Sequence, residues 1–263
     1  MLISEALISH LNIELSKYLG ERILILDYTK LHGGSVNYSF LLKTNKRPFF
    51  IKLNNANAFP KMFELEVKGL KQIENSESLT TPVKVLQGSF GIVSYLVLEF
   101  IESGKESLNF WESFGVGLAN LHKLKQKDFG LSYSNYIGSL HQLNPLTEEW
   151  SAFFGNHRIL NQAQIAYDNK RIGLELLRKL ESLILKIDTI FPKSTPSLLH
   201  GDLWSGNFIV NKESLPVVLD PAIHYGNREM DLSMSLLFGG FNKRFYEAYD
   251  EAYPLQAVSY THL

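Results

Sequence analysis

The sequence predicts an α+β fold in two lobes, in which an antiparallel sheet with one inserted helix precedes a mainly helical part. Two observations lead to this prediction. Residues 1–102 contain several short β-rich runs separated by turn residues, whereas from about residue 108 apolar residues recur with a period near 3.6. The polar stretch 102–105 separates the two patterns, so we expect lobes at 1–102 and 103–263. A chain of 263 residues, 45% of them apolar, is long enough to bury a core in each.

The first lobe is expected to begin with a short helix, because Leu2, Ala6, Leu7 and Leu11 recur at helical intervals. Four β-rich runs then predict the strands of the sheet, at 23–26, 38–43, 49–53 and 92–100. Between the third and fourth strands, Pro60 is suited to the first turn of a helix. The apolar stripe of that helix is formed by Phe63, Val67, Leu70 and Ile73.

The second lobe is expected to be helical over most of its length. The first helix carries an apolar face from Leu108 to His122, and long amphipathic segments follow at 150–167 and 172–187. Prolines at 192 and 196 end this helical region. Two short strands, 208–210 and 216–219, then predict a small hairpin.

Composition excludes several classes of function. Lys and Arg total 26 against 27 Asp and Glu, so the chain lacks the basic field that binds a nucleic-acid backbone. Cysteine is absent, which excludes disulfides, thiolate nucleophiles and cysteine-ligated zinc. Residues 1–17 do not resemble a signal peptide, and no run approaches the roughly 18 apolar residues of a membrane span. We therefore expect a cytoplasmic protein with no nucleic-acid or membrane partner; the oligomeric state stays open.

The motif with the clearest chemistry runs from His200 to Asn207 and is followed by Asp220 at the end of a predicted strand. Phosphoryl transfer requires a carboxylate near the attacking hydroxyl and two oxygen ligands for Mg²⁺. The kinase loop H-x-D-x-x-x-x-N supplies these groups at the spacing of Asp202 and Asn207, and Asp220 then stands where kinases have a second metal-binding aspartate. The alternative is a loop in which these residues only cap turns.

A second set of residues in the first lobe predicts a nucleotide site. A glycine-rich turn between two strands can bring backbone N–H groups against phosphates, and a lysine on the next strand can neutralise phosphate charge. Glu66 lies on or beside the buried stripe of the inserted helix and is expected to pair with that lysine. A plain hairpin turn and an exposed strand lysine are the alternatives. The turn and the lysine are Gly33, Gly34, Ser35, Val36, Asn37 and Lys52.

At these residues the chain resembles the fructosamine kinase, or ketosamine-3-kinase, family, a branch of the protein-kinase-like fold related to aminoglycoside phosphotransferases. The segment 200–207 is similar to the signature of that family, and its Leu-Trp-Ser-Gly-Asn ending is more specific than the His-x-Asp of other small-molecule kinases. The segment 220–231 matches as well. Shorter matches occur at 63–66, 98–100, 129–130, 135–138, 150 and 236–241.

The resemblance implies an ATP-dependent phosphotransferase that acts on the 3-hydroxyl of ketosamines, the fructosamine or ribulosamine adducts of lysine. The phosphorylated product is unstable and releases the amine, which amounts to deglycation. By this resemblance residues 1–102 bind the nucleotide, and residues 103–263 carry the catalytic and substrate-binding groups. Free and protein-bound ketosamines are both possible substrates.

The resemblance also implies roles for individual residues. Asp202 is expected to be the catalytic base, and Asn207 and Asp220 are expected to bind Mg²⁺. Asp231 is expected to brace the catalytic loop. The hinge against adenine is expected at Leu98, Glu99 and Phe100. His200 and Trp204 are the candidates on the substrate side. A structural hydrogen-bonding role is the favoured interpretation for His200, and a place in the core is the alternative for Trp204.

Two features depart from the pattern of the family. Some relatives carry a cysteine in the glycine-rich turn, where this chain has Ser35, so we expect no thiol switch.

The chain also lacks the further, largely helical C-terminal segment of its relatives. A common transposase sequencing adapter, translated in one frame, encodes Val-Ser-Tyr-Thr-His-Leu and permits a preceding alanine, which matches 257–263. We therefore expect Gln256 to be about the last residue encoded by the gene itself.

Two other functions stay open from the sequence. The first is a kinase of another small hydroxyl compound, such as an aminoglycoside, choline or homoserine; the near-neutral charge gives no support to a site for a polycationic aminoglycoside. The second is a pseudokinase that binds nucleotide as a regulatory module. The joint presence of Lys52, Glu66, Asp202, Asn207 and Asp220 argues against it, because a binding module needs no catalytic base.

Overall fold

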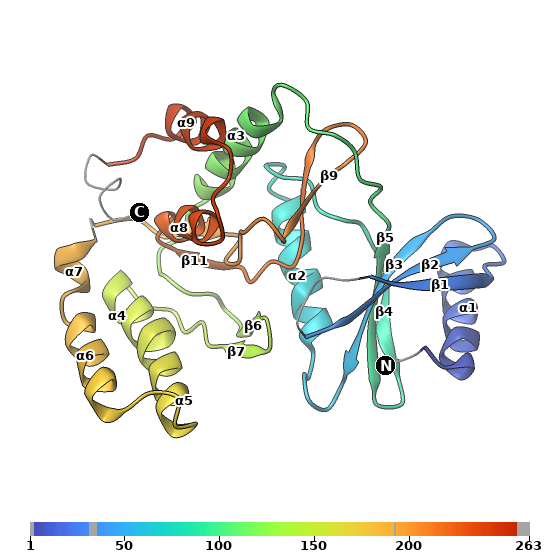
Figure 1. Cartoon of the computed structure of the whole chain (residues 1–263), viewed down its shortest axis with the longest axis horizontal. Coiled ribbons are helices and arrows are strands. Elements are labelled where there is room, and N and C mark those ends of the chain that lie inside the picture. The colour runs from blue at the N-terminus through green and yellow to red at the C-terminus, as the bar shows by residue number, and fades with distance from the viewer. Residues whose placement is uncertain (1–2, 32–35, 192, 257–263) are drawn as a thin grey trace.

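The protein has two lobes, which lie side by side in the computed structural model of Figure 1. The structure describes residues 3–31, 36–191 and 193–256. The first lobe is built on a five-stranded antiparallel sheet in the order β1-β2-β3-β5-β4. Its strands are β1 (Ile25–Leu31), β2 (Tyr38–Thr44), β3 (Phe49–Asn55), β4 (Lys84–Phe90) and β5 (Val93–Glu99).

Two helices cover opposite faces of this sheet. Helix α1 (Glu5–Leu19) begins with Ser4, whose side chain accepts a hydrogen bond from the Leu7 N–H, and it packs a leucine stripe on one face. Helix α2 (Met62–Glu74) packs Phe63 and Leu70 on the other. Since side chains alternate along a strand, β3 turns Ile51 towards α1 and its neighbour Lys52 towards α2.

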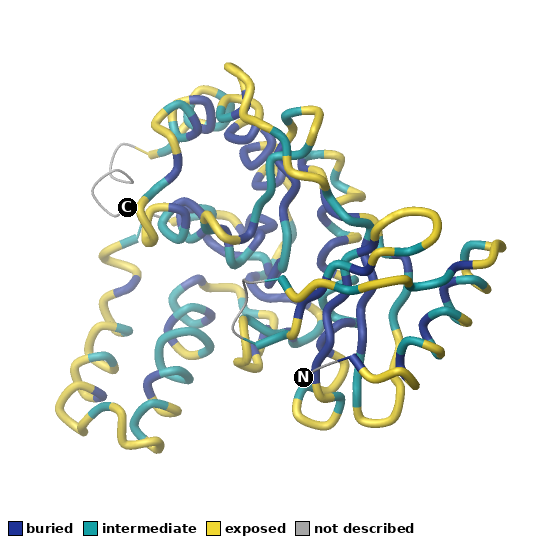
Figure 2. The backbone as a smooth tube through the Cα atoms, turned by 45° about the vertical axis from the view of Figure 1, so that its right-hand side comes forward, coloured by how far each residue is buried: buried dark blue, intermediate teal, exposed yellow. Residues whose placement is uncertain are grey.

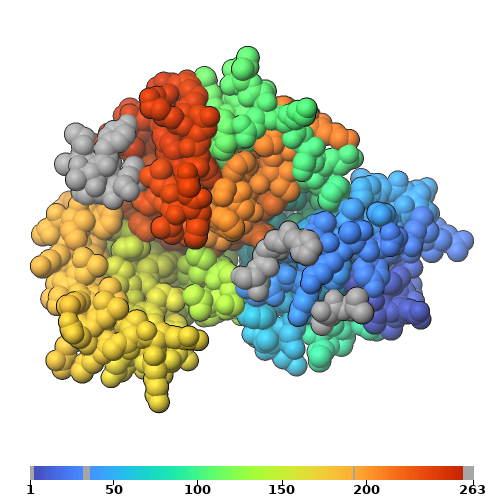
Figure 3. Space-filling model, in the orientation of Figure 1, coloured from blue at the N-terminus to red at the C-terminus, as the bar shows by residue number. Residues whose placement is uncertain are grey.

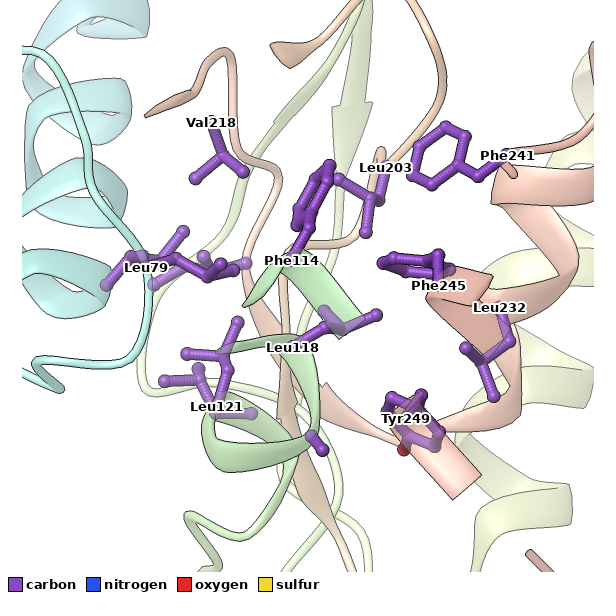
Figure 4. Close-up of a cluster of buried hydrophobic side chains, with 14 of the residues drawn as sticks. Leu79, Phe114, Leu118, Leu121, Leu203, Val218, Leu232, Phe241, Phe245 and Tyr249 are labelled. Atoms are coloured by element: carbon purple, nitrogen blue, oxygen red, sulfur yellow. The ribbon is translucent and has the colours of Figure 1, made fainter. Parts of the chain in front are cut away.

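The second lobe is organised around α3 (Phe110–His122). Helix α9 (Lys243–Ala252) packs against it so closely that a side chain at Gly115 would overlap the Phe245 carbonyl. Figure 4 shows the apolar side chains between them, including Phe114, Leu118 and Tyr249. Figure 2 shows the buried residues concentrated in this core and along the central strands of the sheet.

Residues 150–190 form a helical arm that extends from the second lobe (Figure 1). It packs on the second lobe through Trp150, Phe153 and Ile187, which bury against Phe129. Its elements are α4 (Trp150–Phe154), a π-helix η1 (Gly155–Leu160), α5 (Asn161–Asp168), α6 (Leu174–Ile184) and α7 (Ile187–Ile190).

Three two-stranded ladders and one helix complete the second lobe and position the functional loops. The loop from His200 to Asn207 follows β8, and Asp220 follows β10 shortly after the strand ends. The pairs are β6 (Asn135–Ile137) with β7 (Leu140–Gln142), β8 (Ser197–Leu199) with β11 (His224–Gly226), and β9 (Phe208–Val210) with β10 (Pro216–Val218); the helix is α8 (Glu229–Leu237).

The structure differs from the sequence prediction mainly in its strands. Strand β4 was not predicted, because residues 84–90 include Lys84, Gln87, Gly88 and Ser89 and lack a clear alternation. The β6–β7 hairpin was not predicted either, because its strands, Asn-Tyr-Ile and Leu-His-Gln, contain polar residues and no β-rich apolar run. The expected helix at 150–167 is present but contains the π-helical turn. None of the helices in the described ranges has the length and apolar character that crossing a membrane requires.

Candidate active site

A cleft of about 840 Å³ lies between the two lobes. Figure 3 shows where the first lobe, blue to cyan, meets the orange segment of the second. Strand β3 and helix α2 supply one wall, and the loops after β8 and β10 supply the other. The cleft collects most of the predicted site residues that the structure describes: Val36, Asn37, Lys52, Glu66, Leu98, Glu99, Phe100, Asp202, Trp204, Asn207 and Asp220.

Lys52 joins the two lobes electrostatically inside this cleft. Its Nζ lies 2.7 Å from Glu66 Oε1 on α2 and also pairs with Asp220 Oδ1 from the second lobe. Burial alone would lower the pKa of Lys52, but the two carboxylates outweigh it and raise that pKa above its usual value. Burial also raises the pKa of Glu66, and the charge of Lys52 opposes this rise. Lys52 is therefore a buried cation held between two acids.

Asp202 and Asn207 form a compact unit on the opposite wall. The Asn207 Nδ2 group donates to Asp202 Oδ2 at 2.9 Å and to the Asp202 carbonyl at 2.8 Å. Burial raises the pKa of Asp202 to about 6, the Asn207 hydrogen bond acts in the opposite direction, and the charges of Asp220 and Asp231 reinforce the rise. A carboxylate with a pKa near 6 is ionised at pH 7 and is basic enough to accept a proton.

Asp231, at the start of α8, binds the backbone at the beginning of the 200–207 loop. Its two carboxylate oxygens accept hydrogen bonds from the N–H groups of His200, at 2.7 Å, and Gly201, at 2.9 Å. His122 Nε2 lies 3.1 Å from the same carboxylate. Burial opposes ionisation of Asp231, but these hydrogen bonds and the neighbouring histidines lower its pKa overall.

His200 lies beneath the same loop and is fully buried. Its Nδ1 accepts a hydrogen bond from the Asp202 N–H at 3.3 Å, so Nε2 carries the proton and donates to the Leu219 carbonyl at 3.0 Å. Burial lowers the pKa of His200, which keeps the ring neutral. Both ring nitrogens are thus engaged by backbone groups on either side of the motif, an arrangement that favours the structural role over a substrate contact.

Two backbone conformations near the site are unusual. Asp220 has φ of 54°, a left-handed conformation that is costly for a residue with a side chain. Gly201 has φ of 84°, and a side chain there would overlap the carbonyl oxygen of Ala222. The glycine therefore permits the catalytic loop to lie directly against the loop that follows Asp220.

Oxygen ligands for Mg²⁺ are available in the cleft. Asn207 uses its Nδ2 group to hold Asp202, which leaves its Oδ1 atom as a candidate ligand. The side chain of Asp220 is 43% exposed, although one of its oxygens pairs with Lys52. Among the described residues no group of three or more His, Cys, Asp or Glu side chains is arranged to hold a metal. Mg²⁺ bound beside phosphates needs only one or two protein carboxylates, so the residues present fit it.

Trp204 lines the cleft beside the catalytic loop and is half-buried. Its ring lies 5.2 Å from that of Phe238, and Gly206 packs so closely on the indole that any side chain at 206 would overlap it. The indole thus lies at the surface of the cleft, in contact with Phe238 and Gly206. The glycine-rich turn is described only from Val36 onward; Gly33, Gly34 and Ser35 lie outside the described residues, as does the adapter-like segment 257–263.

Some residues at the site carry no predicted role. Asn135 and Tyr136 line the cleft from the β6–β7 hairpin; both belong to a segment that matches the family, but the resemblance implies no function for them. Asn54 is buried next to Asn37: its Nδ2 lies 3.0 Å from Asn37 Oδ1, and its Oδ1 accepts a hydrogen bond from Ser94. No pattern in the sequence could have distinguished Asn54 from an ordinary strand residue.

Comparison with known proteins decides the family. A sequence model of fructosamine kinase matches residues 7–262. This chain belongs to the fructosamine kinase family. Among its relatives, a "Probable ketoamine kinase" of Enterococcus faecium is 39% identical over 228 residues, which cover 85% of this chain and 79% of that protein. The "Protein-ribulosamine 3-kinase, chloroplastic" of Oryza sativa subsp. indica is 35% identical over 243 residues, which cover 90% of this chain and 70% of that protein.

Solved structures confirm the predicted fold of this fructosamine kinase family member. A "putative fructosamine-3-kinase" of Haemophilus somnus superposes with a TM-score of 0.85 at 27% identity, covering 95% of this chain and 84% of that one. A spectinomycin phosphotransferase solved with ADP and spectinomycin has a TM-score of 0.58 at 16% identity, covers 97% of this chain and 80% of that one, and supports the shared fold alone. The resemblance seen in the sequence and the α+β two-lobed architecture are both confirmed.

Proposed function

We propose that this protein is an ATP-dependent ketosamine 3-kinase, which phosphorylates the 3-hydroxyl of fructosamine or ribulosamine adducts of lysine and so leads to deglycation. The observation that carries the proposal is the position of Asp202 across the cleft from Lys52, with Asn207 and Asp220 beside it. Ketoamine and ribulosamine kinases among the relatives support the substrate class. They favour it over an aminoglycoside, choline or homoserine kinase and over a pseudokinase.

In the proposed reaction Asp202 is the catalytic base. Its carboxylate accepts the proton of the 3-hydroxyl while the hydroxyl oxygen forms a bond to the γ-phosphorus of ATP. The bond between the γ-phosphorus and the oxygen that bridges it to the β-phosphate breaks, and ADP leaves. Asn207 orients the base, because its Nδ2 group holds both the carboxylate and the backbone of Asp202. Desolvation in the cleft keeps the Asp202 carboxylate basic.

On the nucleotide side, Lys52 would neutralise phosphate charge while Glu66 keeps it in place. Adenine would lie against Leu98, Glu99 and Phe100 at the end of β5, and Val36 and Asn37 would lie beside the phosphates together with the glycines of the turn. Asn207 Oδ1 and Asp220 would hold Mg²⁺, which neutralises the charge of the transferring phosphoryl group when bound. These roles correspond to a nucleotide-binding lobe at 1–102 and a catalytic lobe at 103–263.

On the acceptor side, the indole of Trp204 would form a wall of the sugar site. Its ring packs against Phe238 and Gly206 and lines the same cleft as Asp202. An apolar ring face suits the C–H face of a sugar, whose hydroxyls then point to polar groups. His200 does not contact the acceptor in this proposal; it holds the loop instead.

The test is a coupled ADP-release assay with ribulose-lysine, fructose-lysine, an aminoglycoside and choline. We expect turnover with the two ketosamines and a loss of about 10²–10⁴-fold in Asp202→Asn, since a positioned base contributes this much. Ser205→Ala, an exposed neighbour in the same loop, is the matched control and should retain activity. Equal ADP release by the wild type and Asp202→Asn would show that the kinase proposal is wrong. A preference for the aminoglycoside would show that the substrate is an aminoglycoside and not a ketosamine.

A further inference from the structure

The β6–β7 hairpin of the second lobe contacts the helix that carries Glu66. Figure 1 shows the hairpin beside α2. The Tyr136 hydroxyl donates to the Pro60 carbonyl at 3.2 Å, and its ring packs edge-on against Phe59 at 6.3 Å. Pro60 lies two residues before α2 begins at Met62. Tyr136 therefore fixes the start of this helix to the second lobe.

The same hairpin also holds the loop that follows Asp220. Asn135 Nδ2 donates to the Ile223 carbonyl at 2.8 Å, and Gln142 Nε2 donates to the Ala222 carbonyl at 3.3 Å. Asn135 and Gln142 are each 4% exposed. The two carbonyls belong to the second and third residues after Asp220. The hairpin therefore restrains the backbone segment that directly follows this aspartate.

Asn135 is the centre of a buried amide network. Its Oδ1 accepts hydrogen bonds from Gln142 Nε2 at 3.0 Å and Asn144 Nδ2 at 2.9 Å. Arg158 in turn donates to Asn144 Oδ1 at 2.6 Å. A buried network in which each amide has a partner is rigid, because any displacement leaves a polar group unpaired away from water.

The helix and the loop also touch each other directly. A Cβ atom at Gly69 of α2 would lie 3.2 Å from Pro221 Cγ, a tight contact, so the absence of a side chain at residue 69 favours this close approach of the helix to the loop. Lys52 bridges the two elements through Glu66 and Asp220. The hairpin, the helix and the loop thus pack as one unit around the two acids that bind Lys52.

We infer that the β6–β7 hairpin is a positioning element that sets the distance between Glu66 and Asp220, with Asn135 as its principal positioning residue and Tyr136 as its contact to α2. The catalytic importance of that distance rests on the proposed function. The chemistry of phosphoryl transfer does not by itself require this hairpin. Its two cleft-lining residues, Asn135 and Tyr136, donate to backbone carbonyls and so act on the position of neighbouring elements.

The test compares Asn135→Asp with Asn144→Asp in the full chain. The two substitutions make the same chemical change in the same network, but only Asn135 bonds to the loop after Asp220. Asn135→Asp places a carboxylate oxygen against the Ile223 carbonyl. We expect faster hydrogen exchange in residues 219–226 and a kcat lowered by about 10- to 100-fold, as a misplacement near 1 Å causes. The KM for ribulose-lysine should stay within about twofold, because the acceptor wall is untouched.

Equal exchange and equal kcat in the two variants would overturn the inference, and so would a uniform increase in exchange over the whole chain. Should Asn135→Asp fail to fold, Tyr136→Phe serves instead, with Tyr133→Phe as its control. Tyr136 is only partly buried. Tyr136→Phe is expected to speed exchange at residues 60–66 and to lower kcat, and unchanged values would overturn the inference. Hydrogen exchange needs no acceptor substrate and therefore tests the positioning role of the hairpin by itself. A failure of the proposed function would be seen separately, as absent turnover of ketosamines by the wild type.

Discussion

Asn207 donates its side-chain amide to Asp202 twice, at 2.9 Å to the carboxylate and at 2.8 Å to the backbone carbonyl. A single residue therefore orients the proposed base and also limits how basic its carboxylate becomes. Burial raises the pKa of Asp202 to about 6, and the amide limits that rise. The pH dependence of the reaction follows from this pair.

The first prediction concerns pH. The proposed base acts in its ionised form, so kcat/KM is expected to rise with pH and to reach a plateau above a midpoint near 6. Asn207→Ala should move this midpoint upward, because the carboxylate loses a donor that favours its charged form. The check is a pH–rate profile in ADP release, with Ser205→Ala as control. An unchanged midpoint in Asn207→Ala would show that another group titrates.

The second prediction concerns the buried ion pair. Glu66→Gln is expected to lower kcat/KM for ATP by about 10-fold or more, because Lys52 is then held by Asp220 alone and loses its position. Glu64→Gln is the matched control on the same helix; Glu64 pairs with Lys68 at 3.0 Å, and its side chain is 43% exposed. Titration of nucleotide binding and initial rates with ATP measure the effect. Equal losses in both variants would contradict a specific role for Glu66.

The third prediction concerns the support of the catalytic loop. Asp231→Asn is expected to lower the free energy of unfolding by about 3 kcal/mol, because the replacement leaves a buried donor facing the N–H of His200 or Gly201. Asp188→Asn, where an exposed carboxylate accepts from Ser151, should change stability by less than about 0.5 kcal/mol. Urea unfolding curves provide the measurement. A small effect in Asp231→Asn would mean that the loop is held by other contacts.

The fourth prediction separates a clash from a strained dihedral angle. Gly201 and Gly91 both have positive φ, at 84° and 59°, but only at Gly201 would a side chain meet another group, the Ala222 carbonyl. Gly91→Ala is expected to cost about 1 kcal/mol of stability, the usual cost of the left-handed conformation. Gly201→Ala should cost several times more and abolish turnover. Thermal unfolding and ADP release test both variants, and similar costs would contradict the proposed contact between the two loops.

The fifth prediction concerns stability in acid. His224 is buried, and burial together with the charge of Arg158 lowers its pKa to about 3. Protonation therefore favours the unfolded chain, whose histidine titrates near its ordinary 6.5. The stability from this group is complete above about pH 6.5 and is lost as pH falls towards 3; between pH 7 and 5 the loss is about 2 kcal/mol. His224→Gln should flatten this slope in urea unfolding, and the exposed His141→Gln should not.

Local patterns were sufficient to predict most of the first lobe and the identity of most site residues. Strand β3 and helix α2 were predicted because alternation and a 3.6-residue period report burial directly. The pairing of Lys52 with Glu66 could be predicted because a carboxylate on a buried stripe requires a cation. Strand β4 and the β6–β7 hairpin were missed, since a strand whose burial comes from distant elements carries little local signal.

The sequence by itself indicated the family and the residues of the proposed chemistry: a candidate base, candidate metal ligands and a lysine that the structure buries. Only the tertiary structure decided how these groups are held. The bracing role of Asp231 was expected from the family resemblance, but His122, Asn135 and Gly201 contact residues that are far away in the sequence or across a loop, and no role was predicted for them. Spacing along a chain can predict which side chains share a helix face or a strand face. The distance between two loops depends on how separate elements pack, and no local pattern encodes it.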